Sequence, residues 1–111
     1  MANYVNNKEL RKEMIISLNN NELTSSALNM LLLMVDNIQS KFKYDNEDDK
    51  YDCRSHAVEG ILTKWWKYKP TYENTFSFFT QMIKNDLYAG WNKLNKRKAD
   101  FSTSNIFIEP I

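Results

Sequence analysis

The sequence predicts an all-α protein: a compact bundle of about four helices followed by an extended C-terminal tail. Its 111 residues, 42% of them apolar and 14% aromatic, suffice for the core of one small domain. The chain has only two glycines, so few positions suit the tight turns of β-hairpins, and no long stretch alternates apolar with polar residues. We therefore expect one helical domain over residues 1–98 and a separate tail over 99–111.

Capping residues and apolar stripes define two helices in the N-terminal part of the chain. Asn6 stands three residues before a glutamate, which is the pattern of a helix start, and predicts a first helix over 7–18. A polar run ends this helix, and Thr24 or Ser25 can cap a second one that ends near Tyr44. Its apolar face repeats at helical spacing and holds Leu28, Leu31, Leu32, Val35, Ile38 and Phe42.

Two further helices are expected after an acidic loop. Residues 45–52 hold five acidic side chains and one lysine, a net charge of −4, and predict an exposed loop. Asp52 can cap a third helix that Pro70 ends, and Thr75 can cap a fourth that runs to about Lys98. The expected core stripes are Ala57, Val58, Ile61, Leu62, Trp65 and Tyr68 in the third helix, and Phe79, Ile83, Leu87, Trp91 and Leu94 in the fourth.

Residue counts argue against several classes of function. One cysteine cannot form an internal disulfide, and one cysteine with one histidine cannot complete a tetrahedral zinc site, so we expect neither a metal nor a cofactor. Cys53 and His56 share a helical face, but no glycine motif for binding an anion accompanies them, and we expect no enzymatic activity. No apolar run approaches the roughly 20 residues of a membrane span. The sequence is therefore interpreted as that of a cytoplasmic protein with no membrane partner.

The charges are segregated along the chain, although the total is only +1. Residues 54–98 contain nine basic and three acidic side chains, a net charge of +6, together with most of the aromatic residues. Cations neutralise phosphates and ring faces accept unstacked bases, so this composition is typical of contact with single-stranded nucleic acid. A plain core helix with solvated lysines would have a similar composition, and this alternative stays open.

The fourth predicted helix carries a second stripe opposite its core stripe. Steps of three or four residues place Phe78, Gln81, Asn85, Tyr88 and Asn92 on one side. Amide side chains can bond to base edges and aromatic rings can stack on bases, while Lys84 and Lys93 flank the stripe where phosphates would pass. The alternative is a polar solvent face with two exposed aromatic residues.

The order of these segments resembles conserved region two of bacterial RNA polymerase sigma factors. The resemblance rests on the sequence from Glu59 to Trp66 (EGILTKWW) and on that from Phe76 to Asn85 (FSFFTQMIKN), and it covers about residues 4–98. It is strongest to the late-transcription sigma factors of T-even-type bacteriophages, which have a similar opening to YVNNKEL at Tyr4–Leu10 and a similar Thr80-Gln81 followed by Asn85.

This resemblance implies two functional surfaces. One would dock on the clamp helices of the largest subunit of the host core RNA polymerase, through Asp52, Ser55, His56, Glu59, Leu62 and Thr63. The other would recognise and melt an A·T-rich minus-ten promoter element by holding its nontemplate strand, through Phe76, Phe78, Gln81, Met82, Lys84, Asn85, Tyr88, Asn92 and Lys93. Phe78 matches the aromatic residue that stacks on the flipped adenine, whereas Gln81 and Met82 stand where many sigma factors carry paired tryptophans.

The resemblance further implies a phage coactivator and a replication sliding clamp as partners. The clamp would grip a short apolar and acidic C-terminal segment, for which Ile106, Phe107 and Ile108 are the candidates. An apolar tail packed on its own bundle is the alternative. Two other functions remain open: a phage inhibitor that occupies the polymerase clamp without reading DNA, and a general single-strand binder.

Overall fold

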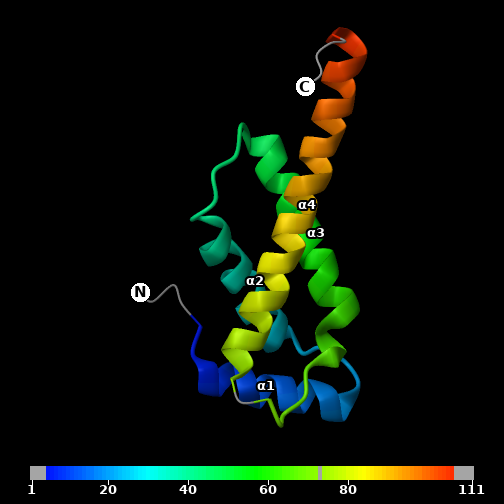
Figure 1. Cartoon of the computed structure of the whole chain (residues 1–111). Coiled ribbons are helices and arrows are strands. Elements are labelled where there is room, and N and C mark those ends of the chain that lie inside the picture. The colour runs from blue at the N-terminus through cyan, green and yellow to red at the C-terminus, as the bar shows by residue number, and fades with distance from the viewer. Residues whose placement is uncertain (1–4, 73, 107–111) are drawn as a thin grey trace.

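Over the residues that it describes, the computed structural model of the chain consists of four α-helices and one short 3₁₀ helix. It describes residues 5–72 and 74–106, of which 97–106 are described as backbone alone. The elements are α1 (Asn7–Asn20), α2 (Ser25–Gln39), α3 (Glu47–Lys64), η1 (Trp65–Lys67) and α4 (Thr75–Ile106). The described residues contain no strand, which confirms the predicted all-α class. Helices α3 and α4 run antiparallel and side by side, α2 packs on both, and α1 lies across the end where α4 begins (Figure 1).

The first two helices begin where the sequence predicts. The Asn6 side chain accepts hydrogen bonds from the backbone N–H groups of Lys8 and Glu9 at 2.9 and 3.1 Å, and the Thr24 hydroxyl accepts one from Ala27 at 3.1 Å. These bonds satisfy backbone donors that the first turn of a helix leaves free. Helix α1 is slightly longer than predicted and ends at Asn20, followed by the C-cap residue Asn21, whose φ of 59° lies in the left-handed region that asparagine tolerates.

Helix α2 ends at Gln39, before the predicted end at Tyr44. The Gln39 side chain is buried, and its amide donates to the backbone carbonyl of Lys50 at 2.8 Å and to the Tyr44 hydroxyl at 3.1 Å. These bonds tie the segment after α2 to the start of α3. Phe42 therefore lies in a connecting loop and not on the helix.

The predicted acidic loop is mostly helix, so the expectation of a loop over 45–52 and of Asp52 as a cap is wrong. Asn46 caps α3, since its side chain accepts a hydrogen bond from the backbone N–H of Asp49 at 2.8 Å. The first turn then carries the carboxylates of Glu47, Asp48 and Asp49. Negative charge at a helix N-terminus is favourable because the helix dipole presents partial positive charge there. The acidic segment thus stabilises the start of α3.

The predicted helix through residue 69 is also corrected, because α3 stops at Lys64 and the chain continues in the 3₁₀ helix η1. Helix α4 is capped by Asn74 and not by Thr75, since the Asn74 side chain accepts from the Ser77 N–H at 2.8 Å. Thr75 is instead buried, with its hydroxyl 2.6 Å from that of Tyr68.

Helix α4 continues past the predicted end at Lys98 to Ile106 and projects beyond the other helices (Figure 1). The predicted boundary between the domain and the tail, at 98/99, thus falls inside a helix. The C-terminal segment does extend away from the bundle, as the sequence predicts.

The core lies where the four helices meet and is formed mainly by the predicted stripes. Its buried members include Leu10, Met14, Leu31, Val35, Ala57, Ile61, Phe79, Ile83, Leu87 and Leu94. Two predicted core residues are instead exposed: Leu62 is 53% exposed and Trp91 is 43% exposed. The stripes are wider than the faces that neighbouring helices cover, so residues at their margins reach solvent.

Candidate nucleic-acid interface on helix α4

The solvent face of α4 forms a continuous polar ridge. Gln81, Asn85, Tyr88 and Asn92 are all exposed on it, as the sequence predicts. The Gln81 amide donates to the Asn85 side-chain oxygen at 2.9 Å, one helical turn further on. This bond leaves the Asn85 amide nitrogen and the Gln81 oxygen able to bond to a base edge.

Phe78 does not lie exposed on this ridge, which corrects one part of the predicted stripe. Its ring is partly buried and stacks on Tyr72, with centroids 5.1 Å apart, and it meets Phe79 edge-on at 5.0 Å and Tyr68 at 5.7 Å. Helix α4 begins beside the link that follows η1, and this link covers one side of the ring. Phe78 therefore belongs to an aromatic cluster at the margin of the core.

The same aromatic cluster forms one wall of a hollow between η1 and α4. This η1–α4 hollow has a volume of about 360 Å³ and is lined by Lys64, Lys67, Tyr72, Phe78, Gln81, Met82 and Asn85. It combines two cations, two aromatic rings and two amides, which are the groups that hold an unstacked base and its phosphates. Four predicted DNA-contacting residues thus meet there: Phe78, Gln81, Met82 and Asn85.

Sequence reasoning missed the other three lining residues of this hollow as site residues. Lys64, Lys67 and Tyr72 contribute to the basic and aromatic character of the segment, but their spacing does not link them to α4. Only the turn of the chain through η1 brings them opposite Gln81 and Asn85. The local excess of positive charge and aromatic residues was the one available signal.

The Lys64 ammonium is held by a buried carboxylate. Its Nζ lies 2.8 Å from Oδ1 of Asp86, a residue that is nearly buried between α3 and α4. The other carboxylate oxygen lies against Gly60, where a Cβ atom would stand only 1.9 Å away. Asp86 thus fixes Lys64 at the rim of the η1–α4 hollow and neutralises part of its charge.

Lys67 has a different environment, with its Nζ 5.7 Å from the centroid of the Trp66 ring. No salt bridge to Lys67 is found among the described residues. Lys67 is therefore the cation of the hollow that can respond most freely to a phosphate.

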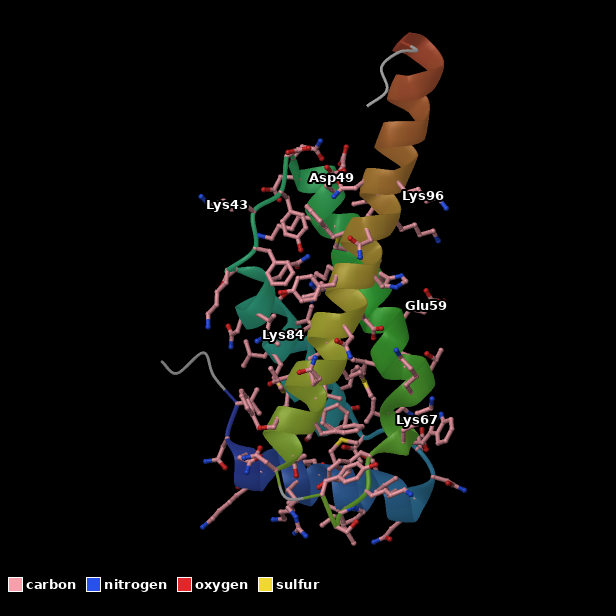
Figure 2. All side chains as sticks on the ribbon, viewed as in Figure 1. Lys43, Asp49, Glu59, Lys67, Lys84 and Lys96 are labelled. Atoms are coloured by element: carbon pink, nitrogen blue, oxygen red, sulfur yellow. The ribbon has the colours of Figure 1, made fainter. Side chains whose placement is uncertain are left out.

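Three other predicted DNA-contacting residues face α2 and not the η1–α4 hollow. Phe76, Lys84 and Tyr88 line a second hollow of about 600 Å³, the α2–α4 hollow, together with Thr80 and the end of α2. Lys84 and Lys67 lie on opposite sides of α4 (Figure 2). Asn92 and Lys93 are exposed further along the helix. The structure thus divides the predicted DNA-contacting residues between the two flanks of one ridge.

The residues predicted to contact polymerase lie together along α3. Asp52, Ser55, Glu59, Leu62 and Thr63 are exposed and follow one face of the helix. His56 is only half-buried, and it packs close to Gly90 of α4, where an added Cβ would lie 3.3 Å from the Cβ of His56.

Trp66 extends this α3 face and was missed by the sequence prediction. It is 58% exposed, and its indole N–H donates to the backbone carbonyl of Thr63 at 2.8 Å. This bond holds the ring against the end of α3, four residues after Leu62 in the sequence. Two large exposed apolar side chains near the end of a polar face are typical of a protein-binding surface.

The thiol and imidazole that share a face of α3 do not form a reactive pair. Cys53 is fully buried, and burial raises the pKa of its thiol above the ordinary value of 9.0. The thiolate is the reactive form, so this side chain is inert near neutral pH. Within residues 5–72 and 74–106, no three His, Cys, Asp or Glu side chains gather as a metal site would need.

The predicted sliding-clamp segment falls mostly outside the described residues. Ile106 is the last residue of α4, and Phe107 and Ile108 lie beyond the part of the chain that the structure describes. Among the described helices, none combines the length and the apolar character that crossing a membrane requires. Comparison of the chain with protein-family models, with curated proteins and with solved structures found no match.

Proposed function

We propose that this protein is a minimal, phage-encoded sigma factor for late transcription. It binds the host core RNA polymerase through α3, and it recognises and melts an A·T-rich minus-ten promoter element along α4. It acts in the cytoplasm of the infected bacterium, with a phage coactivator and a sliding clamp as further partners. The observation that carries the proposal is the presence of two exposed surfaces of different composition, one on α3 that is apolar at its end and the other on α4 that is rich in amides, aromatic rings and lysines.

The α4 surface supports a specific way of holding opened DNA. An unstacked nontemplate base would enter the η1–α4 hollow and stack on Phe78, an interaction worth about 1–3 kcal/mol. Lys67 would neutralise a neighbouring phosphate, while the amides of Gln81 and Asn85 would bond to base edges. The Tyr72 ring stacks on Phe78, so the orientation of the Phe78 ring is fixed before DNA arrives.

The α3 surface supports binding to a coiled coil or another helical partner. Leu62 and Trp66 are the exposed apolar anchors, and Asp52, Ser55 and Glu59 supply a polar margin along the same face. Interfaces of this kind draw most of their binding energy from a few buried aromatic and apolar residues. The two surfaces can therefore be disabled separately.

Run-off transcription with core polymerase on an A·T-rich minus-ten template tests the proposal. Phe78→Leu keeps an apolar side chain in the aromatic cluster but removes the ring, so it should abolish transcription from duplex DNA and retain it on a pre-melted template. Leu62→Glu should abolish capture of the polymerase itself. The matched control is Ile16→Glu, since Ile16 is an exposed apolar residue of α1 that belongs to neither surface.

Other outcomes would identify the two alternative functions. A chain that captures polymerase and displaces host sigma factors, yet protects no unpaired strand, would be an inhibitor. A chain that shifts single-stranded DNA strongly without polymerase and supports no transcription with it would be a general single-strand binder. Normal transcription by Phe78→Leu from a duplex promoter would contradict the proposed mechanism of melting.

A further inference from the structure

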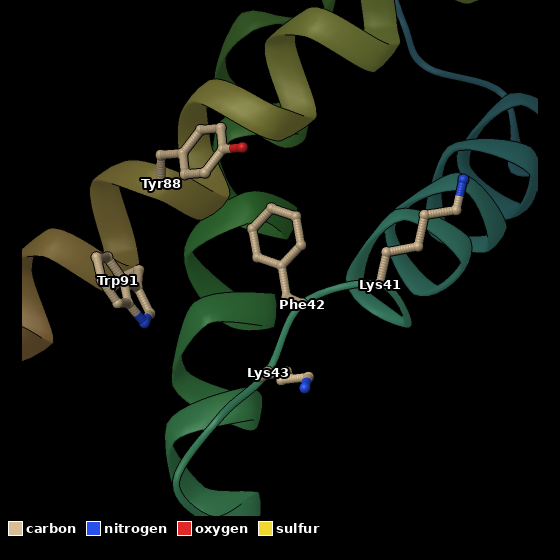
Figure 3. A pocket seen from close by; sticks show the side chains of 5 residues that line it. All are labelled: Lys41, Phe42, Lys43, Tyr88 and Trp91. Atoms are coloured by element: carbon tan, nitrogen blue, oxygen red, sulfur yellow. The ribbon is translucent and has the colours of Figure 1, made fainter.

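A second aromatic and basic surface lies on the α2 side of α4. It consists of Lys41, Phe42, Lys43, Tyr88 and Trp91, named here the Trp91 patch, around a hollow of about 300 Å³ (Figure 3). Tyr88 is 53% exposed and packs on Phe42 with ring centroids 5.3 Å apart. Of these five residues, only Tyr88 belongs to the site that the sequence predicts.

The loop after α2 builds this patch. Gln39 anchors the end of α2 to the start of α3, and the chain between them passes close to α4. Phe42 packs against the core there, while its neighbours Lys41 and Lys43 are exposed on either side of it. Two cations therefore flank a group of aromatic rings, of which Tyr88 and Trp91 remain largely open to solvent.

We propose that the Trp91 patch binds single-stranded nucleic acid. A base stacks on the open ring of Trp91 or Tyr88, and neighbouring phosphates are neutralised by Lys41 and Lys43. The surface matches both parts of such a ligand, because exposed ring faces stack on bases and the flanking ammonium groups neutralise backbone phosphates. The inference rests on the proposed function only for the identity of the strand, which would be a continuation of the nontemplate strand held along α4.

The surrounding charges give the bound strand a direction. The adjoining α2–α4 hollow shares Phe42 and Tyr88 with the Trp91 patch and is also lined by Lys84. Positive charge therefore continues on that side. The next hollow, which also includes Trp91, is lined by Asp45 and Asp49 together with Lys43. Two carboxylates outnumber one ammonium there, whereas the described residues that line the α2–α4 hollow include two lysines and no acidic side chain, so the strand extends from Trp91 toward Lys84 and not toward the start of α3. Asp45→Asn should therefore strengthen binding.

The full chain with short oligonucleotides provides the test, without polymerase. Hexathymidylate or hexauridylate, at low salt, should shift the NMR signal of the Trp91 indole N–H. Trp91→Leu should weaken binding about 5- to 150-fold, the equivalent of one lost stack. Its matched control is Tyr51→Leu, which removes an exposed aromatic ring of α3 that belongs to none of the surfaces described above and should leave the affinity unchanged.

The cations are tested by salt dependence. Replacing Lys41 and Lys43 together with alanine should reduce the slope of log affinity against log salt by about 1.4, because each neutralised phosphate of a single strand contributes about 0.7. The same change at Lys8 and Lys12, two exposed lysines of α1, should leave the slope unchanged. Circular dichroism of each variant confirms that the helices are intact.

Several results would overturn the inference. The first two are an unshifted Trp91 signal and full affinity of the Trp91→Leu variant. The third is a hexaglutamate peptide that shifts the signal as strongly as the oligonucleotides do, because this would indicate an acidic protein partner. Equal binding of duplex DNA would remove the role of stacking. Failure of the proposed function is distinguishable, because Phe78→Leu should leave the Trp91 shift intact and polymerase is absent from the assay.

Discussion

Replacing Gly60 with alanine probes the contact that joins α3 to α4 beside the η1–α4 hollow. An added Cβ would lie 1.9 Å from one carboxylate oxygen of Asp86 and 2.7 Å from its Cγ. The carboxylate cannot move away freely, because it is nearly buried and its other oxygen binds the Lys64 ammonium at 2.8 Å. Either this ion pair shifts or the two helices separate.

Two opposing effects set the size of the change in the free energy of unfolding. Forcing an extra methyl group into packed structure costs about 1–3 kcal/mol. Alanine is favoured over glycine inside a helix by about 1 kcal/mol, which offsets part of that cost. We expect Gly60→Ala to destabilise the protein by up to about 2 kcal/mol, although the same change in an open helix would stabilise it.

A double-mutant cycle separates the two effects. Asp86→Ala removes the atoms that the new methyl group would meet, so Gly60→Ala made in that background should stabilise by about 0.5–1 kcal/mol. The propensity gain is the same in both backgrounds, so the coupling energy equals the cost of the clash, about 1–3 kcal/mol, which exceeds the deviation from additivity of independent sites. Urea denaturation followed by circular dichroism measures all four variants. Additive effects, or a stabilising Gly60→Ala in the original chain, would refute the assigned contact.

Three further predictions concern other parts of the molecule. Burial raises the pKa of the Cys53 thiol, so the folded state keeps that proton at higher pH than the unfolded state does. The free energy of unfolding should therefore fall as pH rises from about 9 through the folded pKa. Cys53→Ala should lessen this fall in urea titrations. Tyr68→Phe leaves the buried Thr75 hydroxyl without its 2.6 Å partner and should cost about 1–2 kcal/mol in the same denaturation assay. Lys93→Ala should weaken promoter binding by the polymerase complex about equally for all sequences and lower its salt slope by about 1, whereas a sequence-dependent loss would contradict a phosphate contact.

The aromatic cluster around Phe78 shows how far helical spacing alone can predict a site. The interval of three or four residues correctly placed Gln81, Asn85, Tyr88 and Asn92 on one exposed face, since residues at that spacing share a side of any helix. It could not show that Tyr72 and Tyr68 cover one side of Phe78, because those rings come from the link before α4.

In the acidic segment, a helix-start signal was present in the sequence, but the high local charge favoured the prediction of a loop. Asn46 has the side chain of an N-cap, and acidic residues in the next three positions suit a helix start. The accumulation of charge favoured the prediction of a loop. In the structure, the Asn46 side chain accepts a hydrogen bond from the Asp49 N–H, so α3 begins five residues before the predicted cap at Asp52.

The sequence by itself determined the all-α class, the two N-terminal caps and the buried stripe of α4. These features depend on neighbours within one or two helical turns, and the residues that set them are adjacent in the chain. Tertiary structure alone decided which margins of each stripe are covered, so Trp91 and Leu62 reach solvent and Asp86 is buried against Gly60. It also brought Lys41 and Lys43 beside Trp91, because the path of the loop after α2 depends on the distant bond between Gln39 and Lys50.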